Sequence, residues 1–509
     1  MSETGEKRAL WSDRKNFIYA TIGAAVGLGN LWRFPFQAYK NGGGAFFLPY
    51  LVALLTCAIP LLILEFAYGR KIRGGSTKAF AQLGKKFEII GWVQVMVPVI
   101  VVMFYCTIIA IAIIFMGASL LHGFGIFSWI DNPGIVMDFA VGSAENAFDF
   151  RAGASIVLIL SVLLVWFVNW FVVRRGISGG IEMACRITTP LLLILMLLFM
   201  VNSLRLEGAG GGLNALFQPN FAAIMDPSIW IAAYAQVFFS TTLAVGVMIA
   251  YGSYLDEKTD IVNSSFITVL GNASFDIVAG ITVFSTLGYL VHTQGLGFDS
   301  FGAGAGVAFI AFPIAISTMT SIPLLQGLIS FIFFFCLFIA GLTSAMSMIE
   351  SFQTSALDKF KIDRKKLTTY VSLVGMAGSL IFATYAGFNF VLDIVDTYVS
   401  NYVIATLGLV ETIAICYIFG SKDLREYANE HSDFKIGVWW DFLLKFVTPV
   451  LLGATVVTNL IGAVDHLIST DGLTLASELV FGWSVVMLMV IVSIIFYRQK
   501  WQVDTHSKK

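Results

Sequence analysis

Two stretches interrupt apolar segments that otherwise suit helices. GAAVGLGN at 23–30 contains three glycines, each of which lowers helix stability by roughly 1 kcal/mol against alanine, and STTLAVG occupies 240–246. Unwound backbone in apolar surroundings needs polar partners. Freed carbonyl groups suit a cation, and the amides that begin the next half-helix favour a carboxylate. The alternative is that Gly23, Gly27 and Gly29 only allow close packing of helices.

Side chains that suit the same chemistry lie in two later apolar segments. Asp276 follows Asn272 by one helical turn, and Thr343 and Ser344 stand side by side near the middle of another segment. An acid inside a membrane-type helix is rare and usually functional, although a local hydroxyl group could also pair with it. Hydroxyl groups such as those of Thr343 and Ser344 could equally bond back to their own helix. Taken alone, these residues leave both readings open.

The composition places all these residues in a membrane. Of 509 residues, 58% are hydrophobic and 12% are charged, and the mean hydropathy is +0.84. Such a chain has too little polar surface to cover a soluble core of its own size. The net charge of -1 gives no sign of nucleic-acid binding.

Enzyme and metal-cluster chemistry find no support in the motifs. The sequence contains no His-Glu zinc motif, Gly-x-Ser-x-Gly elbow or Walker loop, which disfavours a membrane-embedded enzyme. The cysteines lie in apolar segments without metal-type spacing, which predicts buried, inert thiols rather than disulfides or a zinc site. They are Cys57, Cys106, Cys185, Cys336 and Cys416.

About twelve segments are long and apolar enough to cross a bilayer, which takes about 20 residues. They are expected near 14–38, 43–69, 89–121, 154–174, 178–204, 229–255, 261–291, 323–357, 367–386, 388–420, 438–463 and 477–498. The stretches 208–228 and 295–322 are predicted to be outer loops with short helices. The expected fold class is therefore an all-α membrane protein with about 12 transmembrane helices.

Charges in the loops predict the orientation, because lysine and arginine gather on the cytosolic side. The basic loops contain Arg14 and Lys15, Arg70 to Lys86, Arg174 and Arg175, Lys359 to Lys366, and Arg498 and Lys500. The alternate loops are acidic, with Asp131, Asp138, Glu145 and Asp149 in one and Asp465, Asp471 and Glu478 in another. Both termini are thus expected in the cytosol. The sequons at Asn263 and Asn272 would lie on the wrong side for glycosylation, which favours a bacterial or archaeal plasma membrane.

Several motifs resemble those of the neurotransmitter:sodium symporters, which are sodium-coupled carriers. The string VGLGNLWRFPFQAYKNGGGAFFLPY matches their first-helix signature at almost every position. The resemblance continues in IPLLILEFAYGR at 59–70, VFFSTTLAVG and YGSYL in the sixth helix, Asn272 in the seventh, AGLTS at 340–344 and FVLDIVD at 390–396. It covers the first ten helices. It implies sodium-coupled import of a neutral L-amino acid by alternating access.

The same resemblance implies an inverted repeat. Helices one and six are the interrupted pair, and such a pair indicates two halves of opposite orientation around a midplane site; this fold is itself one of the standard examples of that rule. The expected division is a cytosolic tail at 1–13, a first repeat at 14–204, a second at 229–420, helices eleven and twelve at 438–498, and a second tail at 499–509.

Two sodium sites are implied, and no organic cofactor. One would consist of the Ala25 carbonyl, the side chains of Asn30, Asn272 and Ser240, and the substrate carboxylate. The other would consist of the carbonyls of Gly23, Val26 and Ala340 with the hydroxyls of Thr343 and Ser344. Oxygen ligands suit a hard cation.

The implied substrate site surrounds the first break. The head group would lie between the amides of Leu28 and Gly29, the Tyr105 hydroxyl, and Phe239 and Ser240. Monoamine carriers of the family have an aspartate where Gly27 stands, so glycine indicates an amino acid. The side-chain pocket would be lined by uncharged residues, which predicts a neutral and hydrophobic substrate: Ala24, Val101, Phe239, Thr242, Val245, Ser344 and Met348.

Asp276 and the gates complete the expectations from the resemblance. Chloride-dependent relatives have a small polar residue at the position of Asp276, so this carboxylate predicts chloride independence; whether it also carries a proton stays open. Arg33 with Asp396 would close the outside, above Tyr105 and Phe239. Arg8 with Asp358 would close the inside, near Trp11, Ser253 and Tyr254. Glu65 and Glu411 are expected to brace polar backbone.

Other functions within the fold remain open. The substrate could be another small zwitterion such as taurine, a betaine or a γ-amino acid, and the chain could be an amino-acid sensor or channel. The expected partners are the amino acid and the lipid bilayer, with no nucleic acid, and the sequence leaves a homodimer open.

Overall fold

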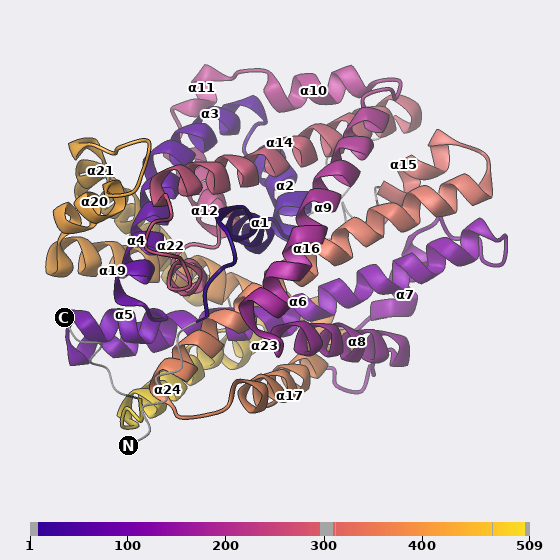
Figure 1. Ribbon diagram of the computed structural model, residues 1–509. Coiled ribbons are helices and arrows are strands. Elements are labelled where there is room, and N and C mark those ends of the chain that lie inside the picture. The colour runs from indigo at the N-terminus through magenta and orange to yellow at the C-terminus, as the bar shows by residue number, and fades with distance from the viewer. Residues whose placement is uncertain (1–8, 296–308, 311, 471, 504–509) are drawn as a thin grey trace.

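The computed structural model describes residues 9–295, 309–310, 312–470 and 472–503 (Figure 1). Most of these residues are helical, and within them an isolated bridge between Ala154 and Thr384 is the one β-type pairing. The predicted all-α class is confirmed. All five cysteines are buried and free, as expected.

The segments of the first half follow the expected order. They are α1 (Arg14–Ala25), η1 (Gly29–Arg33) and α2 (Phe34–Lys40); α3 (Gly44–Ala53), η2 (Leu54–Ala58) and α4 (Ile59–Ile72); α5 (Ser76–Leu83) and η3 (Lys85–Phe87); α6 (Glu88–Gly123); α7 (Gly134–Val141); α8 (Ile156–Val173); and η4 (Ile177–Ile181) with α9 (Glu182–Ser203).

The second half begins with two short helices. It comprises α10 (Ala209–Phe217) and α11 (Phe221–Ile224); α12 (Pro227–Ser240) and α13 (Val247–Gly252); α14 (Ile261–Gln294); α15 (Phe312–Met319); α16 (Pro323–Lys359); α17 (Arg364–Phe382); η7 (Gly387–Val391), α18 (Leu392–Asp396), η8 (Thr397–Ile404), α19 (Ala405–Ala414), η9 (Ile415–Gly420) and α20 (Ser421–Asn429); α21 (Val438–Phe442), η10 (Leu443–Val447) and α22 (Thr448–Ser469); and α23 (Gly472–Ser477), η11 (Glu478–Trp483) and α24 (Ser484–Arg498).

Among the described residues, nine helical segments are long and apolar enough to span a bilayer. Three of the twelve expected spans are missing from that set. Two are the interrupted helices, in which no continuous 18-residue helix exists. The third is α17, whose first turn carries Arg364, Lys365 and Lys366. Several bounds also differ from expectation: α22 extends to Ser469, and helix ten continues through α20 to Asn429.

The interrupted helix α1 lies at the centre of the molecule (Figure 1). It packs against α9, α14 and α16, while α16 and α6 run along each other over most of their length. The half-helix α12 packs on α3, and its continuation α13 packs on α4. The two breaks are therefore enclosed by long, continuous helices, which can hold unwound backbone in place.

The first break is narrower than the sequence suggested. Helix α1 ends at Ala25, only Val26 and Gly27 leave the helix, and the chain resumes with the π turn η1. The expected unwinding over 23–30 is thus too long, because Gly23 remains helical and Gly29 already belongs to the next half-helix.

The second break spans Thr241–Gly246 and is strained. Thr242 and Ala244 have φ values of +54° and +59°, which cost a non-glycine residue roughly 1–2 kcal/mol each. The amide of Ala244 donates to Glu65 Oε1 at 2.8 Å, and Glu65 is fully buried. Glu65 therefore braces unwound backbone, as expected.

Candidate functional site

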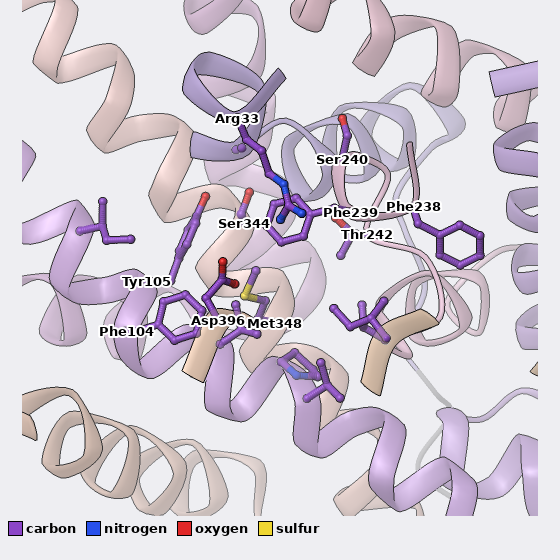
Figure 2. A pocket seen from close by; sticks show the side chains of 18 of the residues that line it. Arg33, Phe104, Tyr105, Phe238, Phe239, Ser240, Thr242, Ser344, Met348 and Asp396 are labelled. Carbon is purple, nitrogen blue, oxygen red and sulfur yellow. The ribbon is translucent and has the colours of Figure 1, made fainter. Parts of the chain in front are cut away.

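A cavity of about 500 Å³ lies between the two breaks, α6, α16 and the start of helix ten (Figure 2). All but one of the residues expected to bind substrate line it: Ala24, Ala25, Gly29, Val101, Tyr105, Phe239, Ser240, Thr242, Val245, Ser344 and Met348. The exception, Leu28, reaches the site through its amide, which donates to Tyr105 Oη at 2.9 Å. Residues that are more than 200 positions apart in sequence thus share one cavity.

Gly27 has no room for a side chain. A Cβ atom added there would lie 2.5 Å from Tyr105 Oη and 2.8 Å from Ser344 Oγ. Its own amide donates to Asn30 Oδ1 at 2.8 Å. The backbone of the first break therefore approaches α6 and α16 closely, and its amides are held by Asn30 and Tyr105.

Polar side chains from three helices meet beside this break. Asn30 Nδ2 donates to Asn272 Oδ1 at 2.9 Å and to Ser240 Oγ at 3.1 Å, and Asn272 Nδ2 donates to Ser240 Oγ at 2.7 Å. Ser240 in turn donates to Asp276 Oδ2 at 3.0 Å. The expected neighbourhood of Asn30, Ser240, Asn272 and Asp276 is present, although Asn30 Oδ1 is occupied by the Gly27 amide.

Tyr50 is part of this network, and sequence reasoning missed it. Its hydroxyl donates to Asp276 Oδ2 at 2.6 Å, and both residues are fully buried. Tyr50 ends the first-helix signature string, but nothing in the string indicates a contact 226 positions along the chain. The second oxygen of Asp276, Oδ1, is buried without a hydrogen-bond partner. A buried, unpartnered carboxylate oxygen fits a site that attracts a cation.

A second group of oxygen atoms lies where α1 meets α16. Ser344 Oγ lies 3.5 Å from the Gly23 carbonyl and 3.3 Å from the Val26 carbonyl. Thr343 Oγ1 lies 3.1 Å from the Ala340 carbonyl. In the part of the chain that the structure describes, no group of three His, Cys, Asp or Glu side chains could hold a metal ion. The donor sets present are carbonyl, amide and hydroxyl oxygens, which suit an alkali cation better than a transition metal.

The cavity extends to the two residues that are expected to form the outer gate, and these residues do not form an ion pair. Arg33 and Asp396 both line it, and no ion pair within 4 Å joins them. The Arg33 guanidinium instead lies over the Phe239 ring, 4.0 Å from its centroid (Figure 2). Asp396 Oδ1 accepts from Ser400 Oγ at 2.7 Å. The site is therefore open toward this pair.

Trp11, which is expected at the inner gate, is buried, with 6% of its surface exposed. Its amide donates to the Tyr254 carbonyl at 3.1 Å and its indole to the Tyr251 carbonyl at 3.0 Å. Asp358 accepts from the Gly75 amide at 2.6 Å. The expected partner of Asp358, Arg8, lies outside the described residues. The second expected brace, Glu411, is buried and hydrogen-bonded to Gln94.

The chain is similar to known transporters over almost its whole length. The model of the sodium:neurotransmitter symporter family matches residues 8–129 and 140–503. An uncharacterized sodium-dependent transporter of Methanocaldococcus jannaschii is 36% identical over 97% of this chain and 98% of its own length. A sodium- and chloride-dependent GABA transporter 2 of Homo sapiens is 30% identical over 89% of the chain and 80% of its own length.

A more distant relative is a sodium-dependent nutrient amino acid transporter 1 of Drosophila virilis, which is 26% identical over 88% of the chain and 76% of its own length. The match of the family model to nearly the whole chain agrees with the broken helices, the buried polar network and the cavity beside them. The chain belongs to the sodium:neurotransmitter symporter family and is a sodium-dependent membrane transporter rather than an enzyme.

Proposed function

We propose that this protein imports a neutral, hydrophobic L-amino acid together with sodium and without chloride. The observation that carries the proposal is the first break, where Gly27 leaves no room for an acid beside Tyr105 and Ser344. A positively charged amine therefore has no carboxylate to meet at this position. The Tyr105 hydroxyl accepts from the Leu28 amide and keeps its own proton, which could be donated to a substrate carboxylate.

The lower cavity supports a neutral substrate side chain. Its walls at Val101, Thr242, Val245 and Met348 are apolar or small. The charged residues of the cavity are confined to the outer part, at Arg33, Asp393 and Asp396. Burying an unpaired charge in such a pocket would cost several kcal/mol, so a charged side chain would be rejected.

Sodium would be a co-substrate held by the two oxygen groups described above. In the first, the substrate carboxylate would stand beside Asn30, Asn272, Ser240 and the Ala25 carbonyl. In the second, Thr343 and Ser344 would act with the carbonyls of Gly23, Val26 and Ala340. The unpartnered oxygen of Asp276 favours a cation in the first group.

Chloride independence follows from the same carboxylate. Asp276 accepts from Tyr50 and Ser240, and such hydrogen bonds favour the ionised carboxylate, which would supply a negative charge next to the first group. A carrier with this charge in place has no need of a bound anion. The human relative is named as chloride-dependent, so the two proteins would differ in this respect.

Alternating access would proceed from a conformation like the one seen here. Closing Arg33 against Asp396 would seal the outer end, and releasing Trp11 from Tyr251 and Tyr254 would open the inner end. The charge pattern of the loops favours both termini in the cytosol, and the sequons at Asn263 and Asn272, on the wrong side for glycosylation, favour a bacterial or archaeal plasma membrane. The matched breaks of helices one and six favour two inverted repeats at 14–204 and 229–420.

A second candidate is a carrier for another small zwitterion. The relative named as a GABA transporter favours a γ-amino acid, while the relative named as a nutrient amino acid transporter favours an α-amino acid. The apolar lining at Val101, Val245 and Met348 favours an α-amino acid with an apolar side chain.

Uptake into proteoliposomes would test the proposal. Labelled leucine, methionine, phenylalanine, alanine, taurine, betaine and γ-aminobutyrate would be supplied under an inward sodium gradient, with chloride or gluconate as the anion. We expect sodium-dependent uptake of at least one apolar amino acid that is equal in both anions. Absence of sodium-dependent uptake for every neutral amino acid would refute the central claim. A sodium current far larger than the substrate flux would instead indicate a sensor or channel.

A further inference from the structure

Helix ten contains a π-helical segment, η8, which begins directly after Asp396 and runs for eight residues. Such wide turns are rare inside helices and often mark functional positions. Thr397, Asn401 and Ile404 of this segment line the outer part of the cavity. The segment therefore connects the outer-gate acid to the remainder of helix ten.

Helix eleven holds the segment by its backbone. Asn459 Nδ2 of α22 donates to the Asn401 carbonyl at 2.7 Å. A second, small cavity of about 60 Å³ lies between Asn401, Asn459, Phe239 and Arg33. The segment thus has a side-chain restraint on one side and free space next to the gate arginine.

Helix twelve holds the segment by its aromatic side chains. Tyr398 Oη donates to Glu478 Oε2 at 3.2 Å, and Glu478 Oε1 pairs with His466 Nε2 at 2.9 Å. The Trp483 ring stacks on Tyr402 with 5.9 Å between centroids and meets Tyr398 edge-on at 5.3 Å. Side chains from α22 and η11 therefore fix both tyrosines of η8.

Asp396 is tied to the same segment, because its carboxylate accepts from Ser400 at 2.7 Å. We propose that η8 is the hinge of the outer gate, and that Asn459 and Glu478 are positioning residues that hold this hinge in its open form. On closure, the segment shifts toward Arg33 and Asp396 exchanges Ser400 for the arginine. This inference rests on the proposed gating role of Arg33 and Asp396, and it gives helices eleven and twelve a part in transport.

Thiol labelling can test the hinge, because all five native cysteines are buried. Gln37→Cys places a reporter on α2 in the outer part of the cavity. In this background, Asn459→Ala, Glu478→Gln and Tyr398→Phe would each remove one restraint. Labelling by a membrane-impermeant thiol reagent would be timed in proteoliposomes with sodium, together with KM and kcat for uptake.

Loss of a restraint makes closure easier, so we expect labelling to slow at least threefold and KM to fall together with kcat. Tyr398→Phe removes only a hydroxyl group and so guards against misfolding of the other variants. Two changes serve as matched controls. Asn202→Ala removes an exposed amide that bonds to its own helix, and Glu207→Gln removes an exposed glutamate paired with His292 at 3.6 Å. Both should label at the parent rate.

If all three hinge variants label at the parent rate and keep the parent KM, the hinge proposal is wrong, even if the variants are thermally less stable. Asp396→Asn separates this failure from failure of the gate itself. If Asp396→Asn alters labelling and uptake while the hinge variants do not, only the hinge is wrong. If Asp396→Asn changes neither, the gating role is wrong and the hinge falls with it.

Discussion

At the scale of single residues, Gly27 is the position at which packing and substrate choice coincide. Gly27→Ala would place a Cβ against Tyr105 Oη and Ser344 Oγ, so the hydrogen bond from the Leu28 amide to Tyr105 would be lost. We expect uptake to fall about 100-fold, which corresponds to roughly 3 kcal/mol. Gly117→Ala on α6 is the control, since an added Cβ there meets nothing within 4 Å.

Gly27→Asp extends the same prediction. It should abolish amino-acid uptake while detergent-solubilised protein remains folded and monodisperse. Initial rates of sodium-driven uptake would measure the effect of both Gly27 substitutions. Full activity of either Gly27 variant would refute the placement of the substrate carboxylate.

Asp276 carries a second prediction. Asp276→Ser removes the fixed charge but keeps a hydroxyl group beside Ser240 and Tyr50. Uptake by this variant should require chloride, whereas the parent should transport equally in chloride and gluconate. Uptake that is independent of chloride in the variant would contradict the proposed role of the carboxylate. Tyr50→Phe should leave the parent's anion independence intact, because the charge remains.

The sequence indicated Gly27 and Asp276 but not Tyr50. Gly27 was readable because a glycine beside Leu28, Gly29 and Asn30 belongs to a specific motif. The acid at 276 was noticeable because charged residues are rare in apolar helices. Tyr50 was not, because an aromatic residue in an apolar stretch looks like core, and only folding shows that its hydroxyl meets Asp276.

At the scale of elements, the second break depends on Gly246. Gly246 has φ +71°, and an added Cβ would lie 2.5 Å from Ser76 Oγ and 3.0 Å from Ser351 Oγ, which itself donates to the Val245 carbonyl. Gly125→Ala is an unusually close control, since Gly125 also has φ +71° but meets nothing within 4 Å.

In both variants the alanine must adopt a left-handed backbone conformation, which should lower the free energy of unfolding by about 1–2 kcal/mol. In Gly246→Ala the free energy of unfolding should fall by about 1–3 kcal/mol more, because the hydroxyl groups of Ser76 and Ser351 must move away from the added Cβ. Chemical unfolding in detergent, followed by intrinsic fluorescence, would measure the difference. Equal losses would show that α5 and α16 do not constrain the break.

The end of helix twelve is anchored by a buried ion pair. Lys359 Nζ contacts Glu88 Oε1 and the carbonyls of Phe496 and Tyr497, and the Trp501 indole donates to Glu88 Oε2. Lys359→Met leaves the Glu88 carboxylate buried without its cationic partner, so it should lower the free energy of unfolding by about 3–5 kcal/mol. Lys422→Met is the surface control, because Lys422 and Glu426 are 72% and 63% exposed and such pairs contribute about 0–1 kcal/mol.

The double variant Lys359→Met with Glu88→Gln should cost less than the two single changes together. Additive losses would mean that the two side chains act separately. None of this was predictable from sequence, because Lys359 looks like an ordinary basic loop residue and its burial appears only when α16, α6 and α24 come together. The order of the helices was readable from apolar length, whereas the narrow first break and the π segments of helix ten depend on packing.

At the scale of the whole molecule, a cavity that reaches Arg33 and Asp396, with Trp11 buried against Tyr251 and Tyr254, fits one stage of the proposed transport cycle. Such a cycle transports two species together only if the binding of each favours the other. Asn30 and Ser240 would provide this link, because they line the cavity and also bond to Asn272 in the proposed sodium site.

The last prediction concerns this coupling. Saturating sodium should lower the dissociation constant of the amino acid by about 5–150-fold, and saturating amino acid should lower that of sodium by the same factor. Equilibrium dialysis on purified carrier would measure both. Asn272→Ala should reduce the factor toward one, while Asn202→Ala, on the exposed face of α9, should leave it unchanged. If amino-acid affinity in the parent does not respond to sodium, the carboxylate is not an ion ligand, and coupling must arise from gate closure alone.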